Sequence, residues 1–75
     1  MNLLPDKHVS LGSSLLGVGA IILRKLDQPA TITGLWERCR TVQEVATFVR
    51  FSLALDLLFS IGAVGIENDL LVRNR

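Results

Sequence analysis

The sequence lacks several features that mark common classes of small protein. Cys39 is the only cysteine, so the chain can form no internal disulfide. No apolar run approaches the roughly 18 uninterrupted residues that a membrane-spanning helix needs. The net charge is only +1 and the basic residues are spread thinly, so no polybasic stripe marks nucleic acid or anionic lipid as a partner. From the single reduced cysteine and the absence of a targeting motif, we predict a cytoplasmic protein without membrane contact.

Catalytic machinery is also missing. His8 and Cys39, each the only residue of its type, are far apart in sequence, and the carboxylates are scattered. No nucleophile and base, metal-ligand cluster or phosphate-binding glycine loop has the required spacing. We therefore predict no catalytic residue, no cofactor and no metal site, and we expect that the protein is not an enzyme.

Apolar residues, in contrast, are abundant. They make up 49% of the 75 residues, and the mean hydropathy is +0.45. A domain this small buries only about 60% of the surface that its unfolded chain exposes, so its own core gives marginal stability. This excess of apolar residues predicts that the chain is part of a hetero-oligomer.

The pattern along the chain predicts one winged-helix-like domain at 10–75 behind an extended N-terminal arm at 1–9. Ser10 is placed to cap a first helix to about Leu26, and Thr31 to cap a short second helix that ends near Cys39. Glycines inside the first helix, Gly17 and Gly19, indicate close approach of another backbone or are simply tolerated.

A capping box at Thr41–Glu44 predicts the start of a long third helix, which Gly62 ends. Two short extended runs around Asn68-Asp69 then predict a hairpin. The fold class is therefore mainly α with a small C-terminal β-hairpin: helix, helix, long helix and two-stranded wing.

At 100° per residue, the third helix has two apolar stripes on roughly opposite sides. The first stripe is Val42, Ala46, Val49, Leu53, Leu57 and Ile61, and the second stripe is Phe48, Phe51, Leu55, Leu58 and Phe59. One stripe suffices for a small core, so we expect the second stripe to bind a partner. Alternatively, the helix breaks near Thr47 and both halves fold inward.

Asp56 lies at the edge of the first stripe, where burial of an unpaired carboxylate would cost several kcal/mol. Three arrangements satisfy this residue: an ion pair with Arg24 or Lys25, a basic group on another subunit, or exposure to solvent.

The predicted order of elements also admits a winged-helix transcriptional repressor that binds DNA. Such a protein reads bases with polar and basic residues of its third helix. Gln43, Thr47 and Arg50 could reach a groove, and Arg73 and Arg75 could reach phosphate from the wing. This set is small for specific binding, so a protein-binding winged helix is the preferred interpretation.

Several blocks of the sequence together resemble a known family. They are Leu3–Val9, Ser14–Leu23, Leu35–Glu37, Phe51–Leu58 and Ile61–Val64. In order and spacing they resemble the middle component 6 proteins of bacterial ABC-three-component systems. The Leu-Leu-Pro-Asp-Lys-His and Leu-Ala-Leu-Asp blocks are the most specific parts.

The resemblance implies a small, non-catalytic adaptor that bridges or stabilises an SMC-like ABC ATPase and an effector subunit in Lamassu-related anti-phage defence. Weak or indirect DNA contact would occur through the complex. The resemblance adds weight to functional roles for His8 and Asp56, which lie in the matching blocks. Together with the second stripe and the arm, the predicted partner-binding residues are Leu4, Pro5, Lys7, His8, Phe48, Phe51, Leu55, Asp56, Leu58 and Phe59.

Overall fold

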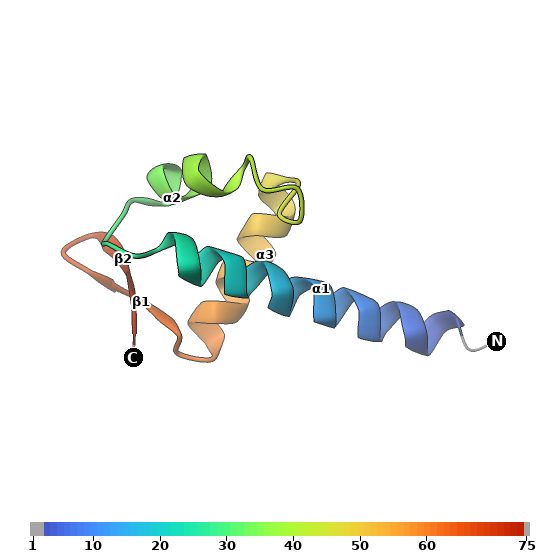
Figure 1. The fold of residues 1–75 in the computed structure, drawn as a ribbon. Coiled ribbons are helices and arrows are strands. Elements are labelled where there is room, and N and C mark those ends of the chain that lie inside the picture. The colour runs from blue at the N-terminus through green and yellow to red at the C-terminus, as the bar shows by residue number, and fades with distance from the viewer. Residues whose placement is uncertain (1–2, 75) are drawn as a thin grey trace.

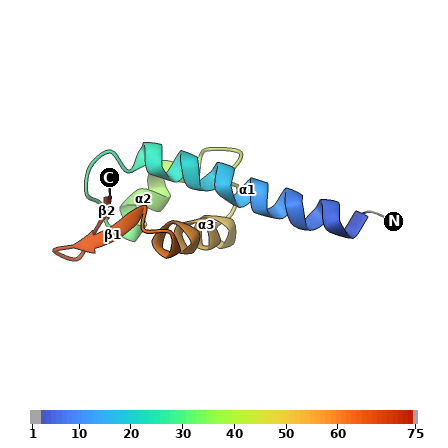
Figure 2. The same ribbon diagram turned by 90° about the horizontal axis from the view of Figure 1, so that it is seen from below.

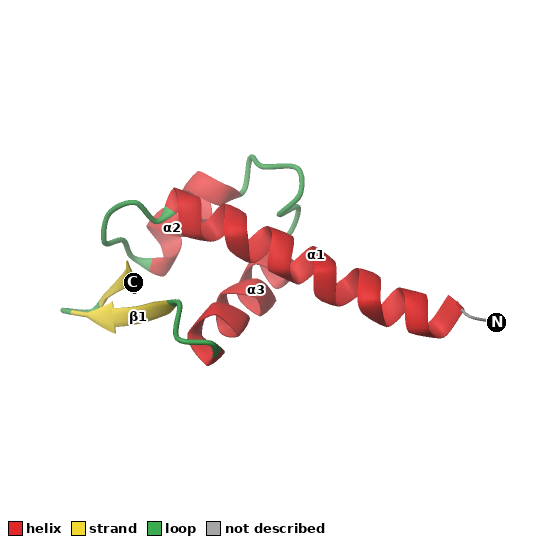
Figure 3. Cartoon of the chain, turned by 60° about the horizontal axis from the view of Figure 1, so that its bottom comes forward, coloured by secondary structure: helices red, strands yellow, loops and turns green. Residues whose placement is uncertain are grey.

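The computed structural model describes the backbone of residues 3–74 and the side chains of residues 14–74. Three helices, α1 (Leu3–Lys25), α2 (Ile32–Cys39) and α3 (Phe48–Ser60), precede the strands β1 (Val64–Glu67) and β2 (Leu70–Arg73). Figures 1 and 3 show α2 and α3 beside the C-terminal half of α1, with the hairpin at the end of the molecule opposite the N-terminus. The mainly helical, winged-helix-like arrangement predicted from the sequence is confirmed. Within the described residues, no helix has the length and apolar character needed to cross a membrane.

The hairpin is the most regular part of the C-terminal region. Its strands pair antiparallel, with Glu67 opposite Leu70 and Val64 opposite Arg73. Asn68 and Asp69 form the connection with φ values of 53° and 66°, the left-handed conformation that a two-residue hairpin turn requires. Ala30, between α1 and α2, exchanges two backbone hydrogen bonds with Leu71, of 3.1 and 2.7 Å. These bonds attach the hairpin to the helical part of the chain.

The core lies where α1 crosses α3. Gly19 of α1 is buried there, and a Cβ built on it would lie 3.1 Å from Leu58 Cδ2. Another element thus lies close to Gly19, although the neighbouring atom belongs to the Leu58 side chain and not, as the sequence predicted, to a backbone. At Gly17, among the described residues, no atom other than those of its two neighbours and its own helix backbone lies within 4 Å of such a Cβ. Figure 1 shows α3 crossing α1, and Figure 2 shows α3 below α1. The buried apolar residues are Val18, Ile22, Leu26, Ala30, Leu35, Cys39, Val45, Phe51, Ala54, Leu55, Leu58, Val64 and Leu71.

The extended N-terminal arm is a wrong prediction over the residues that the structure describes. Helix α1 begins at Leu3 and continues through Ser10, so Ser10 is not an N-cap. Pro5 is compatible with this helix because it lies in the first turn, where backbone N–H groups have no intrahelical acceptor. Figures 1 and 2 both show the N-terminal half of α1 projecting beyond the other elements.

The second helix follows the prediction, but the third begins later than predicted. Thr31 caps α2, since its hydroxyl accepts a 3.0 Å hydrogen bond from Gly34 N. The capping box at Thr41 does not form, and Thr47 caps α3 by accepting a 3.1 Å bond from Arg50 N. Residues 41–46 instead form turns, in which Val45 is fully buried and Ala46 has φ of 65°. The alternative prediction placed a break in the helix near Thr47, and this break is therefore confirmed.

The end of α3 agrees with the sequence. Gly62 has φ of 78°, and its N–H donates to the carbonyl oxygen of Phe59 at 3.1 Å. Ala63 N donates to the carbonyl oxygen of Leu58 at 2.9 Å, which completes a glycine-terminated C-cap. This cap turns the chain from α3 into β1.

Candidate docking surfaces

Helix α3 buries one side and exposes the other. Its buried residues are Phe51, Ala54, Leu55 and Leu58. The opposite side carries Val49, 67% exposed, and Leu53, 49% exposed, followed by exposed Asp56 and Ser60. We call Val49, Leu53, Asp56 and Ser60 the outer face of α3. Two large apolar side chains on this face are left largely uncovered by the described residues.

The second stripe is therefore not an open docking surface, contrary to the sequence prediction. Phe51, Leu55 and Leu58 are at most 5% exposed, and Phe59 is partly buried against the core. The first stripe was expected to form the core, but four of its members, Ala46, Val49, Leu53 and Ile61, are exposed. The two stripes have exchanged roles because α1 crosses α3 on the side of Leu58.

Side-chain size is the signal that sequence reasoning missed. Phe51, Leu55 and Leu58 present more apolar area than Val49 and Leu53, and burying the larger set gains more free energy. Both stripes were apolar enough to be a core, so hydrophobicity alone gave no reason to choose between them.

Phe48 is the predicted partner-binding residue of α3 that retains an exposed apolar side chain. It is 49% exposed, and its ring meets that of Trp36 edge-on, with centroids 5.4 Å apart and planes at 84°. Phe51 lies behind both rings, at 5.3 Å from Trp36 and 5.7 Å from Phe48. Ile32, one turn before Trp36, is also 49% exposed. We call Ile32, Trp36, Phe48, Val49 and Leu53 the α2–α3 surface.

Asp56 is exposed, which is one of the three arrangements considered for it. The ion pairs found among the described residues are Arg38–Asp27 at 3.5 Å and Arg40–Glu37 at 3.2 Å, so Asp56 has no such partner there. Ser60 Oγ donates to the backbone carbonyl oxygen of Asp56 at 2.9 Å, which leaves the carboxylate free. The expected role of Asp56 in partner binding stays a prediction.

The other predicted residues lie in the projecting part of α1. Leu4, Pro5, Lys7 and His8 fall within its first two turns, and their side chains lie outside the described part of the structure. The segment that was predicted to be an extended arm is therefore helical over the described residues. The partner contacts of these side chains stay predictions.

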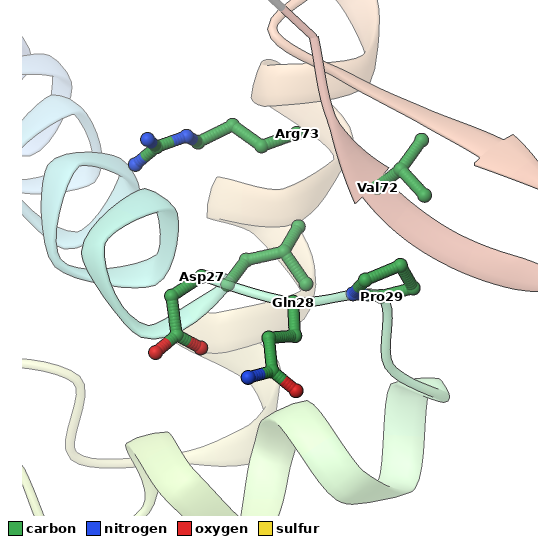
Figure 4. Close-up of a pocket in the computed structure, with 6 residues that line it drawn as sticks. Asp27, Gln28, Pro29, Val72 and Arg73 are labelled. Atoms are coloured by element: carbon green, nitrogen blue, oxygen red, sulfur yellow. The ribbon is translucent and has the colours of Figure 1, made fainter.

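Two arginines, Arg38 and Arg73, hold the C-terminal end of α1, and Arg73 is the one that was expected to reach phosphate from the wing. Arg73 Nη1 donates to the Leu23 carbonyl oxygen at 3.0 Å, and Arg38 Nη1 donates to that of Lys25 at 3.1 Å. Both cations lie where the helix dipole is negative, which is a favourable position. Figure 4 shows Arg73 across a hollow of about 190 Å³ from Asp27 and Gln28. The Arg73 guanidinium thus stabilises the fold and does not project freely from the wing toward a phosphate.

Of the remaining DNA-binding candidates, Arg75 lies outside the described residues, and the other three are also poorly placed. Gln43 lies in the turns before α3, Thr47 caps the helix, and Arg50 is partly buried. On the outer face of α3, a groove would meet Val49, Leu53 and the negative charge of Asp56. This face lacks the bidentate donors that read base edges.

Cys39 is fully buried at the end of α2. Burial raises the pKa of its thiol, and the positive charges of Lys25 and Arg38 oppose part of that rise. A thiol in this state is a poor nucleophile. The described residues also contain no group of three or more side chains suited to holding a metal ion.

Comparison with known proteins gives one match. The family model described as "ABC-three component (ABC-3C) system Middle Component 6" matches residues 4–75. Searches of curated proteins and of solved structures gave no match. The match covers the projecting half of α1, the helical core and the hairpin together. As the sequence resemblance predicted, the chain belongs to the ABC-three component system Middle Component 6 family.

Proposed function

We propose that the protein is a non-catalytic, cytoplasmic adaptor that joins an SMC-like ABC ATPase to an effector subunit in a Lamassu-related anti-phage defence complex. Its family supports this proposal, because a middle component of a multi-component system implies partner components. The chain would act by binding and positioning these partners.

The observation that carries the proposal is the exposed α2–α3 surface. Phe48, Val49 and Leu53 are each at least 49% exposed, and the Phe48 ring contacts that of the buried Phe51. Exposed large apolar side chains on a small protein mark sites where another protein binds, and aromatic side chains near the centre of such sites supply much of the binding energy. Docking of a partner on this surface would remove these side chains from water.

The projecting half of α1 would supply a second contact. It extends away from the rest of the chain, so a partner can approach it from several sides (Figure 1). Leu4, Pro5, Lys7 and His8 are the residues predicted to bind there. A partner held by both the α2–α3 surface and α1 would be fixed in orientation as well as position.

The bridging role has a direct test. The chain is coexpressed with the ATPase and effector components of its system, and the tagged effector is purified. We expect the ATPase to copurify with the effector only when the chain is present. Equal recovery of ATPase from cells that lack the chain would contradict the bridging role.

A further inference from the structure

A hollow of about 220 Å³ lies beside α1 near the start of α3. It is lined by Ser14, Gly17, Val18, Ile21, Glu44 and Arg50. Gly17 opens this space, because within the described part of the chain no atom other than those of its two neighbours and its own helix backbone lies within 4 Å of where its Cβ would be. The described part of the chain therefore leaves the hollow unfilled.

Arg50 gives the hollow a specific chemical requirement. Its Nε is buried and has no hydrogen-bond partner among the described residues. The Arg50 side chain also takes no part in the two ion pairs found there, Arg38–Asp27 and Arg40–Glu37. A guanidinium N–H that is removed from water needs an acceptor, and the strongest acceptors for it are carboxylate oxygens.

We propose that the hollow binds a glutamate or aspartate side chain of the ATPase component, an inference that rests on the adaptor function proposed above. The carboxylate would accept hydrogen bonds from Arg50, and the methylene groups of the same side chain would pack against Val18 and Ile21. Ser14 would add a hydroxyl donor.

Glu44 also borders the hollow, and its negative charge opposes a second carboxylate. However, Glu44 is exposed, so solvent screens this repulsion, whereas the Nε of Arg50 is buried and its interaction is screened less. The positive charge of Arg50 in the lining therefore favours an anionic side chain.

The primary test is the affinity of purified ATPase for the full chain and its variants. Arg50→Gln removes the charge, and Gly17→Leu fills the hollow from a position where the chain has room for the side chain. We expect each to weaken binding by about tenfold or more, as the loss of a charge-assisted hydrogen bond predicts. Arg40→Gln, with the same charge change outside the hollow, and Gly17→Ala are the matched controls and should change affinity less than about twofold.

The pattern of losses separates this inference from the function on which it rests. Wild-type affinity in both Arg50→Gln and Gly17→Leu, with binding lost in Leu53→Asp, would overturn the hollow as a partner site and leave the adaptor function standing.

A second measurement tests carboxylate binding in the hollow directly. It applies even if the wild-type chain binds no ATPase and the adaptor function itself fails. The Arg50 Nε–Hε signal of the ¹⁵N-labelled full chain is followed by NMR during titration with butyrate and with the neutral butyramide. We expect a saturable shift with butyrate that is absent with butyramide and absent in Gly17→Leu. Equal responses to both compounds would overturn the proposal.

Discussion

Gly17 and Gly19 belong to the same helix but have different surroundings. Gly17 is exposed, and among the described residues only its two neighbours and its own helix backbone come within 4 Å of a built Cβ. A Cβ at Gly19 would instead lie 3.1 Å from Leu58 Cδ2. Gly17→Ala should therefore raise the free energy of unfolding by about 0.5–1 kcal/mol through higher helix propensity. Gly19→Ala should gain clearly less, because Leu58 has to move. Urea unfolding of both variants checks the order, and an equal gain would contradict the close packing at Gly19.

Cys39 makes a prediction about pH. Burial raises the pKa of its thiol above the ordinary value of 9.0. The folded chain therefore keeps this proton at pH values where the unfolded chain releases it. The stability that this group contributes is fully present below about pH 9 and is lost as the pH rises through the folded pKa.

Two measurements check this prediction. A thiol reagent at pH 8 should modify native Cys39 at least about tenfold more slowly than the urea-unfolded chain. Stability of the wild type above pH 9 should fall more steeply than that of Cys39→Ala, since other titrating groups are common to both. Fast modification of the native chain would show that the thiol is accessible.

At the scale of elements, the two sides of α3 should respond oppositely to mutation. Leu55 is 5% exposed and Leu53 is 49% exposed on the same helix. Leu55→Ala should lower the free energy of unfolding by about 2–5 kcal/mol, the range for a buried leucine. Leu53→Ala should change it by less than about 1 kcal/mol, because it removes few core contacts. Thermal unfolding followed by circular dichroism measures both, and a larger loss in Leu53→Ala would restore the first stripe as the core.

The elements that the sequence predicted well are those with local signals. Thr31 was recognised as a cap from its residue type and position, and Asn68-Asp69 as a turn from its two residues. Gly62 was recognised as the end of α3 because glycine accepts a positive φ at low cost. Each signal depends on a few neighbouring residues, so no tertiary contact was needed.

The wrong predictions arose where tertiary contacts decided the structure or where two local signals competed. Thr41–Glu44 has the sequence of a capping box, but burial of Val45 draws this segment into turns and the helix starts after Thr47. Ser10 was taken as the N-cap because its residue type fits that position, but α1 already begins at Leu3, with Pro5 in its first turn. The choice between the two stripes of α3 depended on where α1 crosses, and Gly19 was the one hint of that crossing. The hollow beside Arg50 needs three segments together, so no local pattern could have shown it.

The whole molecule is elongated, with extents of 48 × 25 × 16 Å. Its length comes from α1, whose N-terminal half projects beyond α2, α3 and the hairpin (Figure 2). The apolar excess seen in the composition is thus divided between a small core and exposed side chains, four of which, Ile32, Phe48, Val49 and Leu53, belong to the α2–α3 surface. This division is the structural basis for a chain that works as one component of a larger complex.

The most direct test of the adaptor proposal compares two exposed aliphatic residues, Leu53 and Ile66, in different elements. Leu53 lies on the α2–α3 surface, whereas Ile66, 63% exposed, lies on β1. Leu53→Asp and Ile66→Asp each place a carboxylate on the surface and should leave the circular dichroism spectrum unchanged. The tagged chain is coexpressed with the ATPase component, and the recovered ATPase is measured. We predict that Leu53→Asp loses the ATPase and that Ile66→Asp retains it. A folded Leu53→Asp variant that recovers as much ATPase as the wild type would contradict docking through the α2–α3 surface.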